Sequence, residues 1–289
     1  MGNNDLVIEA RDLRRTFKQK VAVNDISFTV PRGTIYGLLG PNGAGKTTTI
    51  RMLSGQIAPD SGSATVAGCN VVNDLARLKQ VIGVVFEDQN LYERLTGRQN
   101  LAFSCWLYGL PLRRADEVLD LVKLRDRGKD AVKAYSNGMR QRLMIARALL
   151  HKPAVLFLDE PSRGLDPISA REVRQSIEEL SHEGMTILLT THLMEEADQL
   201  CQRIGFIVNG QLVANDTPQR LKLAHGQRAI TVTLGDDGGD LRDVNLHMDS
   251  APDQQQLSRW MADGQVRAMH TREASLEDVF VEIAGIRPA

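Results

Sequence analysis

The segment that most constrains this chain is a glycine-rich stretch that joins a predicted strand to a predicted helix. Residues 40–47 read GPNGAGKT and match the phosphate-loop pattern G-x-x-x-x-G-K-[ST] at every fixed position. The apolar segment 34–39 precedes the motif, and residues 49–53 continue as a helix candidate. Glycines let backbone N–H groups approach phosphates without side-chain obstruction. This context predicts a site for a nucleoside triphosphate rather than a glycine-rich turn with a solvated lysine.

The residue types of this loop match the charge of such a ligand. We expect Lys46 to contact the β- and γ-phosphates and the Thr47 hydroxyl to bind Mg²⁺, while the start of the following helix adds partial positive charge. The predicted members of the loop site are Gly40, Pro41, Asn42, Gly43, Ala44, Gly45, Lys46, Thr47 and Thr48.

The overall charge argues against nucleic acid as a partner. Charged residues make up 25% of the 289 residues and nearly cancel, for a formal net charge of −1, so no global field attracts nucleic acid.

The cysteines and the apolar pattern bear on where the protein is found. Cys69, Cys105 and Cys201 form no CxxC pair and suit a reducing compartment. No apolar run approaches the roughly 18 residues of a membrane span, and residues 1–5 lack the features of a signal peptide. We expect a cytoplasmic protein that contacts a membrane only through a partner.

Two later strands end in polar residues that suit a nucleotide site. Residues 155–158 form a continuous apolar run, typical of a central parallel strand, and Asp159 and Glu160 follow it. Because side chains alternate along a strand, we expect one carboxylate to face the metal and the other a water. The next apolar strand, 185–191, ends at His192. We expect His192 near the γ-phosphate, at the carboxyl end of the sheet.

Helical patterns occupy the middle of the chain. Residues 101–110 form one helix candidate, which ends before Pro111. A second candidate has one apolar face, made by Ala115, Val118, Leu119 and Val122. These patterns predict a helical subdomain at about residues 91–133, inserted between strands.

Two signals further along the chain mark helix starts. Ser136, Asn137 and Gly138 open a helix, and they act there either as a simple cap or as a second anion site, since a helix start has free N–H groups. Ser169 and Glu172 have the spacing of a capping box and are expected to open a later helix.

The pattern changes again beyond residue 223. Residues 230–234 alternate as a strand, residues 236–240 (DDGGD) read as a polar turn or loop, and residues 275–278 cap a last helix. We expect a small appendage at 224–289. The apolar face of its last helix packs within that appendage, against a second copy or against a permease.

Taken in order, the motifs resemble those of the ABC (ATP-binding cassette) ATPases over residues 5–223. Residues 40–47 resemble Walker A, 135–139 (YSNGM) the signature sequence, 156–160 (LFLDE) Walker B, 164–166 (GLD) the D-loop, and His192 the switch histidine. The signature upstream of Walker B singles out this family among NTPases. The resemblance implies an α/β fold: a P-loop NTPase core of the ABC type with an antiparallel β subdomain and an inserted α-helical subdomain, plus a small α+β C-terminal appendage.

The resemblance also implies roles that position alone leaves open. Phe17, which lies among charged residues and is either an exposed apolar residue or a platform for a purine, matches the aromatic position that stacks on adenine. Glu160 and His192 are the implied catalytic residues, and Asp166 is implied in communication across a dimer. Ser136, Asn137 and Gly138 are implied to bind the ATP of a partner cassette, so that a homodimer closed around two ATP molecules is the expected active form.

The sequence departs from the family pattern at two motifs. The signature reads YSNGM where the usual form is LSGGQ, so that Asn137 replaces a glycine and Met139 a glutamine. The Q-loop glutamine position falls on Glu87, whose carboxylate is expected to ligate Mg²⁺ together with Thr47 and Asp159 while adding negative charge beside the phosphates. Gln89 supplies the amide if the loop register is shifted.

The resemblance implies the nucleotide-binding subunit of a membrane exporter that uses ATP and Mg²⁺. The segment 274–280 (ASLEDVF) resembles the tail of a branch that exports drugs, sodium and polysaccharides through permeases on separate chains. We therefore expect a peripheral protein on the cytoplasmic face of the cell membrane. The alternative is a soluble ABC protein of translation or DNA repair, but such proteins usually carry two cassettes or a long coiled coil, and this chain has one cassette and no extended heptad run.

Overall fold

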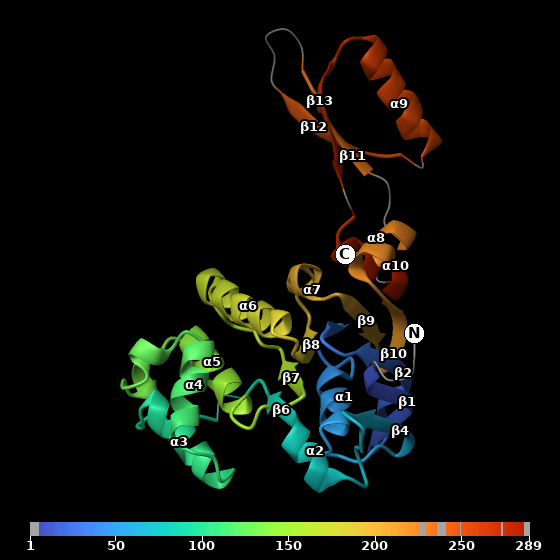
Figure 1. Ribbon diagram of the computed structural model, residues 1–289. Coiled ribbons are helices and arrows are strands. Elements are labelled where there is room, and N and C mark those ends of the chain that lie inside the picture. Colours follow the sequence, from blue (N-terminus) through green and yellow to red (C-terminus); the bar gives the residue numbers. More distant parts are fainter. Residues whose placement is uncertain are drawn as a thin grey trace. The chain divides into compact units, whose positions relative to one another are not determined.

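The computed structural model describes residues 6–88, 90–225, 229–235, 241–248, 250–272 and 274–285. The chain divides into two compact units, residues 1–215 and 216–289, whose elements are labelled in Figure 1. The division falls between Asn215 and Asp216 rather than at the expected residue 223. The reason is that α8 (Pro218–His225) packs against α10 (Leu276–Ala284), an element of the second unit.

A six-stranded sheet with the order β10-β9-β3-β8-β7-β6 forms the centre of the first unit. Its strands are β3 (Ile35–Leu39), β6 (Ile82–Val85), β7 (Val155–Asp159), β8 (Thr186–Thr191), β9 (Arg203–Val208) and β10 (Gln211–Asp216). β3, β7 and β8 are buried along their whole length, as strands covered on both faces are. β3 pairs parallel with β8 and β9, and β7 pairs parallel with β6 and β8. The carboxyl ends of these five strands therefore meet at one edge, and the candidate site lies there.

Five helices of the first unit accompany this sheet. They are α1 (Lys46–Leu53), α2 (Leu75–Val81), α5 (Asn137–Ala148), α6 (Pro167–His182) and α7 (Met194–Leu200). α1 packs against β7, α5 against β6 and α7 against β3. Each of these contacts places a helix next to a strand that is followed by a predicted site residue or by a loop that contains one.

A second, antiparallel sheet with the order β2-β1-β4-β5 belongs to the same unit. Its strands are β1 (Leu6–Phe17), β2 (Lys20–Pro31), β4 (Ser61–Val66) and β5 (Cys69–Asn70). The two sheets share one apolar core, in which Phe28 of β2 stacks on Tyr36 of β3 with ring centroids 5.1 Å apart. The expected antiparallel β subdomain is confirmed. The core that the two sheets share fixes β1, whose last residue, Phe17, lines the same cavity as the phosphate loop.

The helical subdomain contains α3 (Gly97–Leu107), α4 (Arg113–Leu121) and two short 3-10 turns, Arg125–Arg127 and Val132–Ala134. The predicted apolar face of α4 is confirmed, since Ala115, Val118, Leu119 and Val122 are buried. α3 starts earlier than the expected residue 101, because Thr96 and Gln99 form a capping box with reciprocal hydrogen bonds.

The predicted capping box at Ser169 is wrong. α6 starts at Pro167, and the carboxylate of Asp166 accepts hydrogen bonds from the backbone N–H groups of Ile168 and Ser169 at 3.1 and 3.0 Å. Aspartate is an effective N-cap, and proline is well tolerated in the first turn. Ser169 therefore lies inside the first turn, where it is buried.

The second unit contains a three-stranded antiparallel sheet with the order β12-β11-β13. Its elements after α8 are β11 (Ala229–Leu234), β12 (Arg242–His247), α9 (Ala251–Ala262), β13 (Val266–Arg272) and α10. Ile230, Val232 and Leu234 form a small core with Leu246 of β12 and Leu257 of α9. The predicted strand at 230–234 and the capping box formed by Ser275 and Asp278 are confirmed. The predicted turn at 236–240 lies outside the described residues.

Candidate nucleotide-binding and hydrolysis site

The phosphate loop joins β3 to α1 and keeps its shape through two glycines packed against neighbouring backbone. A Cβ atom on Gly40 would lie 2.2 Å from the carbonyl oxygen of Ile207, and one on Gly45 would lie 2.4 Å from that of Ala22. Gly45 also has φ 112°, in the left-handed region where side chains are strained. Only glycine fits these two positions, and the loop is thereby held close to β2 and β9.

Lys46 is folded over this loop. Its Nζ atom donates to the carbonyl oxygens of Gly40 at 2.7 Å and Pro41 at 3.2 Å, and it lies 3.0 Å from Oε1 of Glu160. The side chains of Lys46 and Glu160 are each only 5% exposed. A charge this well buried needs a partner of opposite charge, and each of these two groups supplies one to the other.

The residues around Thr47 fit a magnesium ion. Asp159 is buried, and its Oδ1 atom accepts from the hydroxyls of Thr47 at 3.1 Å and Thr190 at 2.5 Å. Hydroxyl and carboxylate oxygens are the ligand types that Mg²⁺ prefers, and such sites usually complete the coordination with water and substrate phosphates. The described residues contain no cluster of three or more His, Cys, Asp or Glu side chains that could hold a metal ion.

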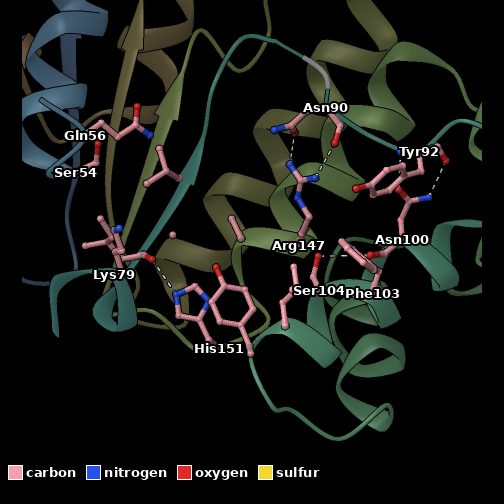
Figure 2. A pocket seen from close by; sticks show the side chains of 16 residues that line it. Ser54, Gln56, Lys79, Asn90, Tyr92, Asn100, Phe103, Ser104, Arg147 and His151 are labelled. Atoms are coloured by element: carbon pink, nitrogen blue, oxygen red, sulfur yellow. Dashed lines mark hydrogen bonds between the residues drawn. The ribbon is translucent and has the colours of Figure 1, made fainter. Parts of the chain in front are cut away.

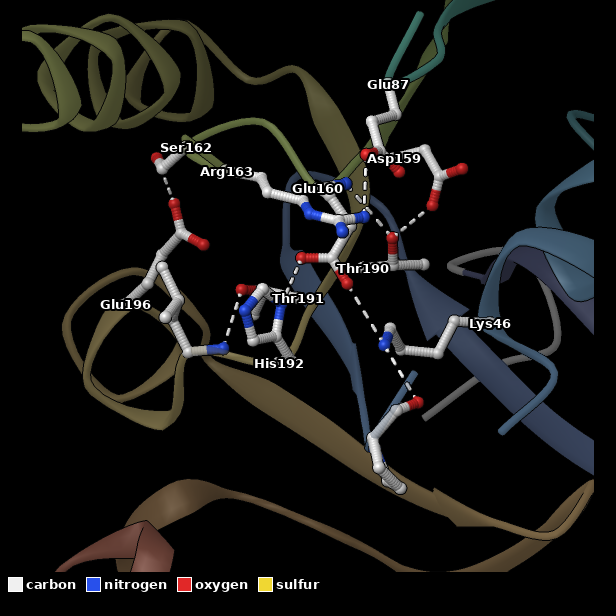
Figure 3. Close-up of polar contacts among 12 residues, drawn as sticks. Lys46, Glu87, Asp159, Glu160, Ser162, Arg163, Thr190, Thr191, His192 and Glu196 are labelled. Atoms are coloured by element: carbon white, nitrogen blue, oxygen red, sulfur yellow. Dashed lines mark hydrogen bonds and ion pairs between the residues drawn. The ribbon is translucent and has the colours of Figure 1, made fainter. Parts of the chain in front are cut away.

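Glu160 also contacts His192, which lies just beyond the end of β8. His192 Nδ1 is 2.8 Å from Oε2 of Glu160, so the two carboxylate oxygens of Glu160 face the histidine and Lys46 (Figure 3). The backbone of Glu160 has φ 52°, and its N–H donates to the carbonyl oxygen of Thr190 at 3.0 Å. The segments after β3, β7 and β8 thus bring Lys46 and His192 into contact with the Glu160 carboxylate at one end of the sheet.

Lys46 and Glu160 line a cavity of about 520 Å³, whereas Asp159 and His192 do not contribute to its wall. The predicted site residues in its wall are Phe17, Asn42, Gly43, Gly45, Lys46, Thr47, Thr48, Glu87 and Glu160. Gly40 and Pro41 contribute carbonyl oxygens to Lys46. The Phe17 ring is partly exposed, and the guanidinium carbon of Arg15 lies 5.1 Å from its centroid. Phe17 therefore adds an aromatic surface to the same cavity wall as Glu87 and Glu160.

The signature residues lie elsewhere, at the start of α5. Ser136 is the N-cap, and its hydroxyl accepts from the backbone N–H of Met139 at 3.2 Å. Ser136 and Asn137 are exposed, while Gly138 packs so closely that a Cβ atom would lie 2.6 Å from the side chain of Ser169. None of the three lines the 520 Å³ cavity.

Two contributing residues were not predicted from the sequence. Thr190 holds Asp159, and its position two residues before His192 on a strand was a usable signal, because side chains two apart share a face. Arg163 lines the same cavity and lies 2.6 Å from Glu87 (Nη1 to Oε1). Gln89, the alternative amide donor, lies outside the described residues.

A buried contact links the segments that follow β7 and β8. The Ser162 hydroxyl, from the loop that follows Glu160, donates to the carboxylate of Glu196 in α7, the helix that follows His192. Glu196 is 2% exposed, and this burial raises the pKa of its carboxyl group. The contact ties the segment that carries Glu160 to the segment that carries His192.

A second cavity, of about 700 Å³, lies between β6, α3 and α5 (Figure 2). Aromatic side chains line it: Tyr108 stacks on His151 with centroids 4.8 Å apart, and Tyr92 meets Phe103 edge to face at 5.5 Å. His151 Nε2 lies 2.8 Å from the carbonyl oxygen of Ile82, and burial lowers the pKa of this histidine. The imidazole is therefore neutral near pH 7 and donates from Nε2.

A phosphate loop between strand and helix, with an acidic residue at the end of another strand of the same sheet that accepts a hydrogen bond from the loop threonine, defines a P-loop nucleoside triphosphatase. The sequence model of the ABC transporter family matches residues 23–163. The chain is 43% identical over 264 residues to the fluoroquinolones export ATP-binding protein of Mycobacterium tuberculosis (strain CDC 1551 / Oshkosh), covering 91% of this chain and 88% of that protein.

Two further similarities also point to the ABC transporter family. The chain is 37% identical to the daunorubicin resistance ATP-binding protein DrrA3 of Streptomyces coeruleorubidus, covering 97% of this chain and 96% of that protein. The solved structure of cbiO1 from Clostridium perfringens, part of the ABC transporter complex cbiONQ, matches with a TM-score of 0.72 at 26% identity, over 77% of this chain and 93% of that one. The chain belongs to the ABC transporter family, as an ATP-binding subunit that hydrolyses ATP.

Proposed function

We propose that this subunit drives export of a substrate through a separate permease, with Glu160 and His192 as its catalytic residues. The observation that carries the proposal is the Glu160 carboxylate, held between Lys46 and His192 in a cavity formed by the phosphate loop. The names of the two similar proteins, which refer to fluoroquinolone export and daunorubicin resistance, support export rather than translation or DNA repair.

In this proposal the triphosphate replaces Glu160 as the partner of Lys46. Lys46 and the loop N–H groups bind the phosphates, with Phe17 stacked on the adenine. Glu160, released from the ammonium, then accepts a proton from the attacking water at Oε1, while His192 keeps the carboxylate oriented through Oε2. Thr47, Asp159 and the loop of Glu87 would hold Mg²⁺, which neutralises charge on the β- and γ-phosphates when bound. Orientation and electrostatic stabilisation then supply most of the rate enhancement.

We further propose that two copies pair head to tail. Ser136, Asn137 and Gly138 stand at a helix N-terminus outside the chain's own cavity, so their free N–H groups are available to the γ-phosphate bound by a second copy. Asp166, whose carboxylate caps α6, lies on the loop that follows Glu160 and is proposed to communicate between the copies.

The 700 Å³ cavity is the proposed docking site of the permease. Its wall combines aromatic residues in and beside α3 with Arg147 and His151, and Trp106 of α3 is 74% exposed. Such a mixture suits a helical segment of another protein. In the described parts of the chain, no helix is both long and apolar enough to cross a membrane. We therefore propose that the subunit sits on the cytoplasmic face of the membrane, bound through the permease.

ATP hydrolysis by the purified chain tests the pairing. We expect the specific activity to rise with protein concentration, because the active species contains two copies, and Ser136→Ala to lose most of it. The exposed Ser63→Ala on β4 is the matched control. Full activity of Ser136→Ala at concentrations where the chain is monomeric would contradict paired sites, and a ribosome- or DNA-bound pool without a multi-span partner would contradict transport.

A further inference from the structure

Arg163 and Glu87 meet because their strands are neighbours. β6 and β7 are parallel, with Val85 opposite Leu158, so the loops that follow them leave the same edge of the sheet side by side. Glu87 lies on the first loop and Arg163 on the second, and Arg163 Nη1 is 2.6 Å from Glu87 Oε1 (Figure 3). Both residues line the 520 Å³ cavity that holds Lys46 and Glu160.

The charges in this cavity explain what such a pair does. The charged side chains in its wall are Lys20, Lys46, Glu87, Glu160 and Arg163. Glu160 is partnered by Lys46, and Glu87 by Arg163. A carboxylate at the Q-loop position would repel a triphosphate if it stood alone. Because Arg163 is paired with the Glu87 carboxylate, the pair has no net charge, like the neutral glutamine that the family usually has at this position.

We infer that Arg163 is a positioning residue: it holds the Glu87 carboxylate at the wall of the nucleotide cavity and offsets its charge toward the triphosphate. This inference rests on the proposed nucleotide site. It accounts for the departure at the Q-loop, because the glutamate that replaces glutamine comes with an arginine on the neighbouring loop.

The pair contributes to ligand binding rather than to folding. The side chains of Arg163 and Glu87 are 43% and 49% exposed, and ion pairs with this exposure add little to stability. The field of either charge still acts on a ligand that carries several negative charges in the same cavity. Removal of one partner is therefore expected to change the affinity for nucleotide and to leave thermal unfolding of the free protein unchanged.

The experiment measures binding of a fluorescent ATP analogue, N-methylanthraniloyl-ATP, to the full-length chain in EDTA and in Mg²⁺. At low ionic strength in EDTA, Arg163→Ala is expected to weaken binding about fivefold and Glu87→Gln to tighten it about fivefold, because each changes the cavity by one unit charge. The double variant returns to within about twofold of wild type, and all effects shrink in 0.5 M KCl, where the screening length is only a few ångströms. Arg113→Ala, which removes an exposed arginine from α4 outside the cavity, is the charge-matched control.

The outcomes separate the two proposals. If the wild-type chain binds no nucleotide, or Lys46→Ala binds as well as wild type, the proposed nucleotide site is wrong. If wild type binds but Arg163→Ala has the affinity of wild type and of Arg113→Ala, the role of Arg163 is wrong and the site stands. If Arg163→Ala does not fold, Glu87→Gln tests the inference by itself. The inference then requires Glu87→Gln to bind the nucleotide more tightly than wild type does.

Discussion

Replacement of Glu160 by glutamine separates its two roles. Glu160→Gln keeps the size of the side chain but removes the negative charge that Lys46 and His192 contact at 3.0 and 2.8 Å. General-base catalysis typically contributes 10²- to 10⁴-fold, so we expect the hydrolysis rate to fall by roughly 100- to 10,000-fold. ATP binding persists, because the loop and Lys46 are unchanged.

The same substitution has a calculable effect on the free protein. Lys46 keeps its hydrogen bonds to Gly40 and Pro41 but loses its carboxylate while remaining buried. A buried polar group that loses one of several partners costs about 1–3 kcal/mol of stability. Bound ATP supplies a new partner for Lys46, so ATP is expected to raise the melting temperature of Glu160→Gln by more than that of wild type.

The assays are a steady-state phosphate-release measurement and thermal unfolding with and without ATP. Slow hydrolysis combined with a larger ATP-induced stabilisation supports the competition between Glu160 and phosphate for Lys46. Unchanged hydrolysis would refute the catalytic role. An ATP-induced stabilisation equal to that of wild type would refute the competition while leaving the catalytic role in place.

Two further predictions concern residues around the site. The guanidinium of Arg15 packs on the ring of Phe17. Because the ring loses this cation–π contact, Arg15→Ala is expected to raise the KM for ATP about threefold with little change in kcat. Arg11→Ala, on the same strand, is the control, and equal KM values for the two variants would contradict the prediction. Burial raises the pKa of the Glu196 carboxyl group above its usual value of about 4.5, so the folded state binds the carboxyl proton more tightly than the unfolded state does. The protonated carboxyl group therefore contributes stability at low pH, and this contribution is lost as the pH rises from about 4.5 through the higher pKa of the folded state. Glu196→Gln, which stays uncharged, is therefore expected to show a flatter dependence of unfolding free energy on pH over that range, and parallel curves for wild type and variant in chemical denaturation would contradict this.

Local sequence signals predicted the elements whose shape depends on neighbouring residues. The phosphate loop could be predicted from its glycines, which the structure shows packed against the carbonyl oxygens of Ile207 and Ala22. The buried strand before Asp159 and the capping box at Ser275 were likewise predicted, because burial of a whole strand and a three-residue hydrogen-bond spacing are both visible in a short window.

Competing local signals were harder to rank. Ser169 and Glu172 have the spacing of a capping box, but Asp166 followed by proline begins α6 one turn earlier. Both patterns satisfy the rules for a helix start, and the structure adopts the one at Asp166. The boundary near residue 216 also depends on tertiary packing, since α8 packs on α10 of the second unit.

By itself, the sequence determined the class of protein and most of the residues that line the phosphate-loop cavity, because a phosphate loop and a strand-end carboxylate are encoded in contiguous residues. Only the tertiary structure decided which charges are paired. The contacts of Glu160 with Lys46, and of Glu87 with Arg163, join residues that are far apart in the chain. They exist because the order of parallel strands brings separate loops to one edge of the sheet, and no local pattern in the sequence records that order.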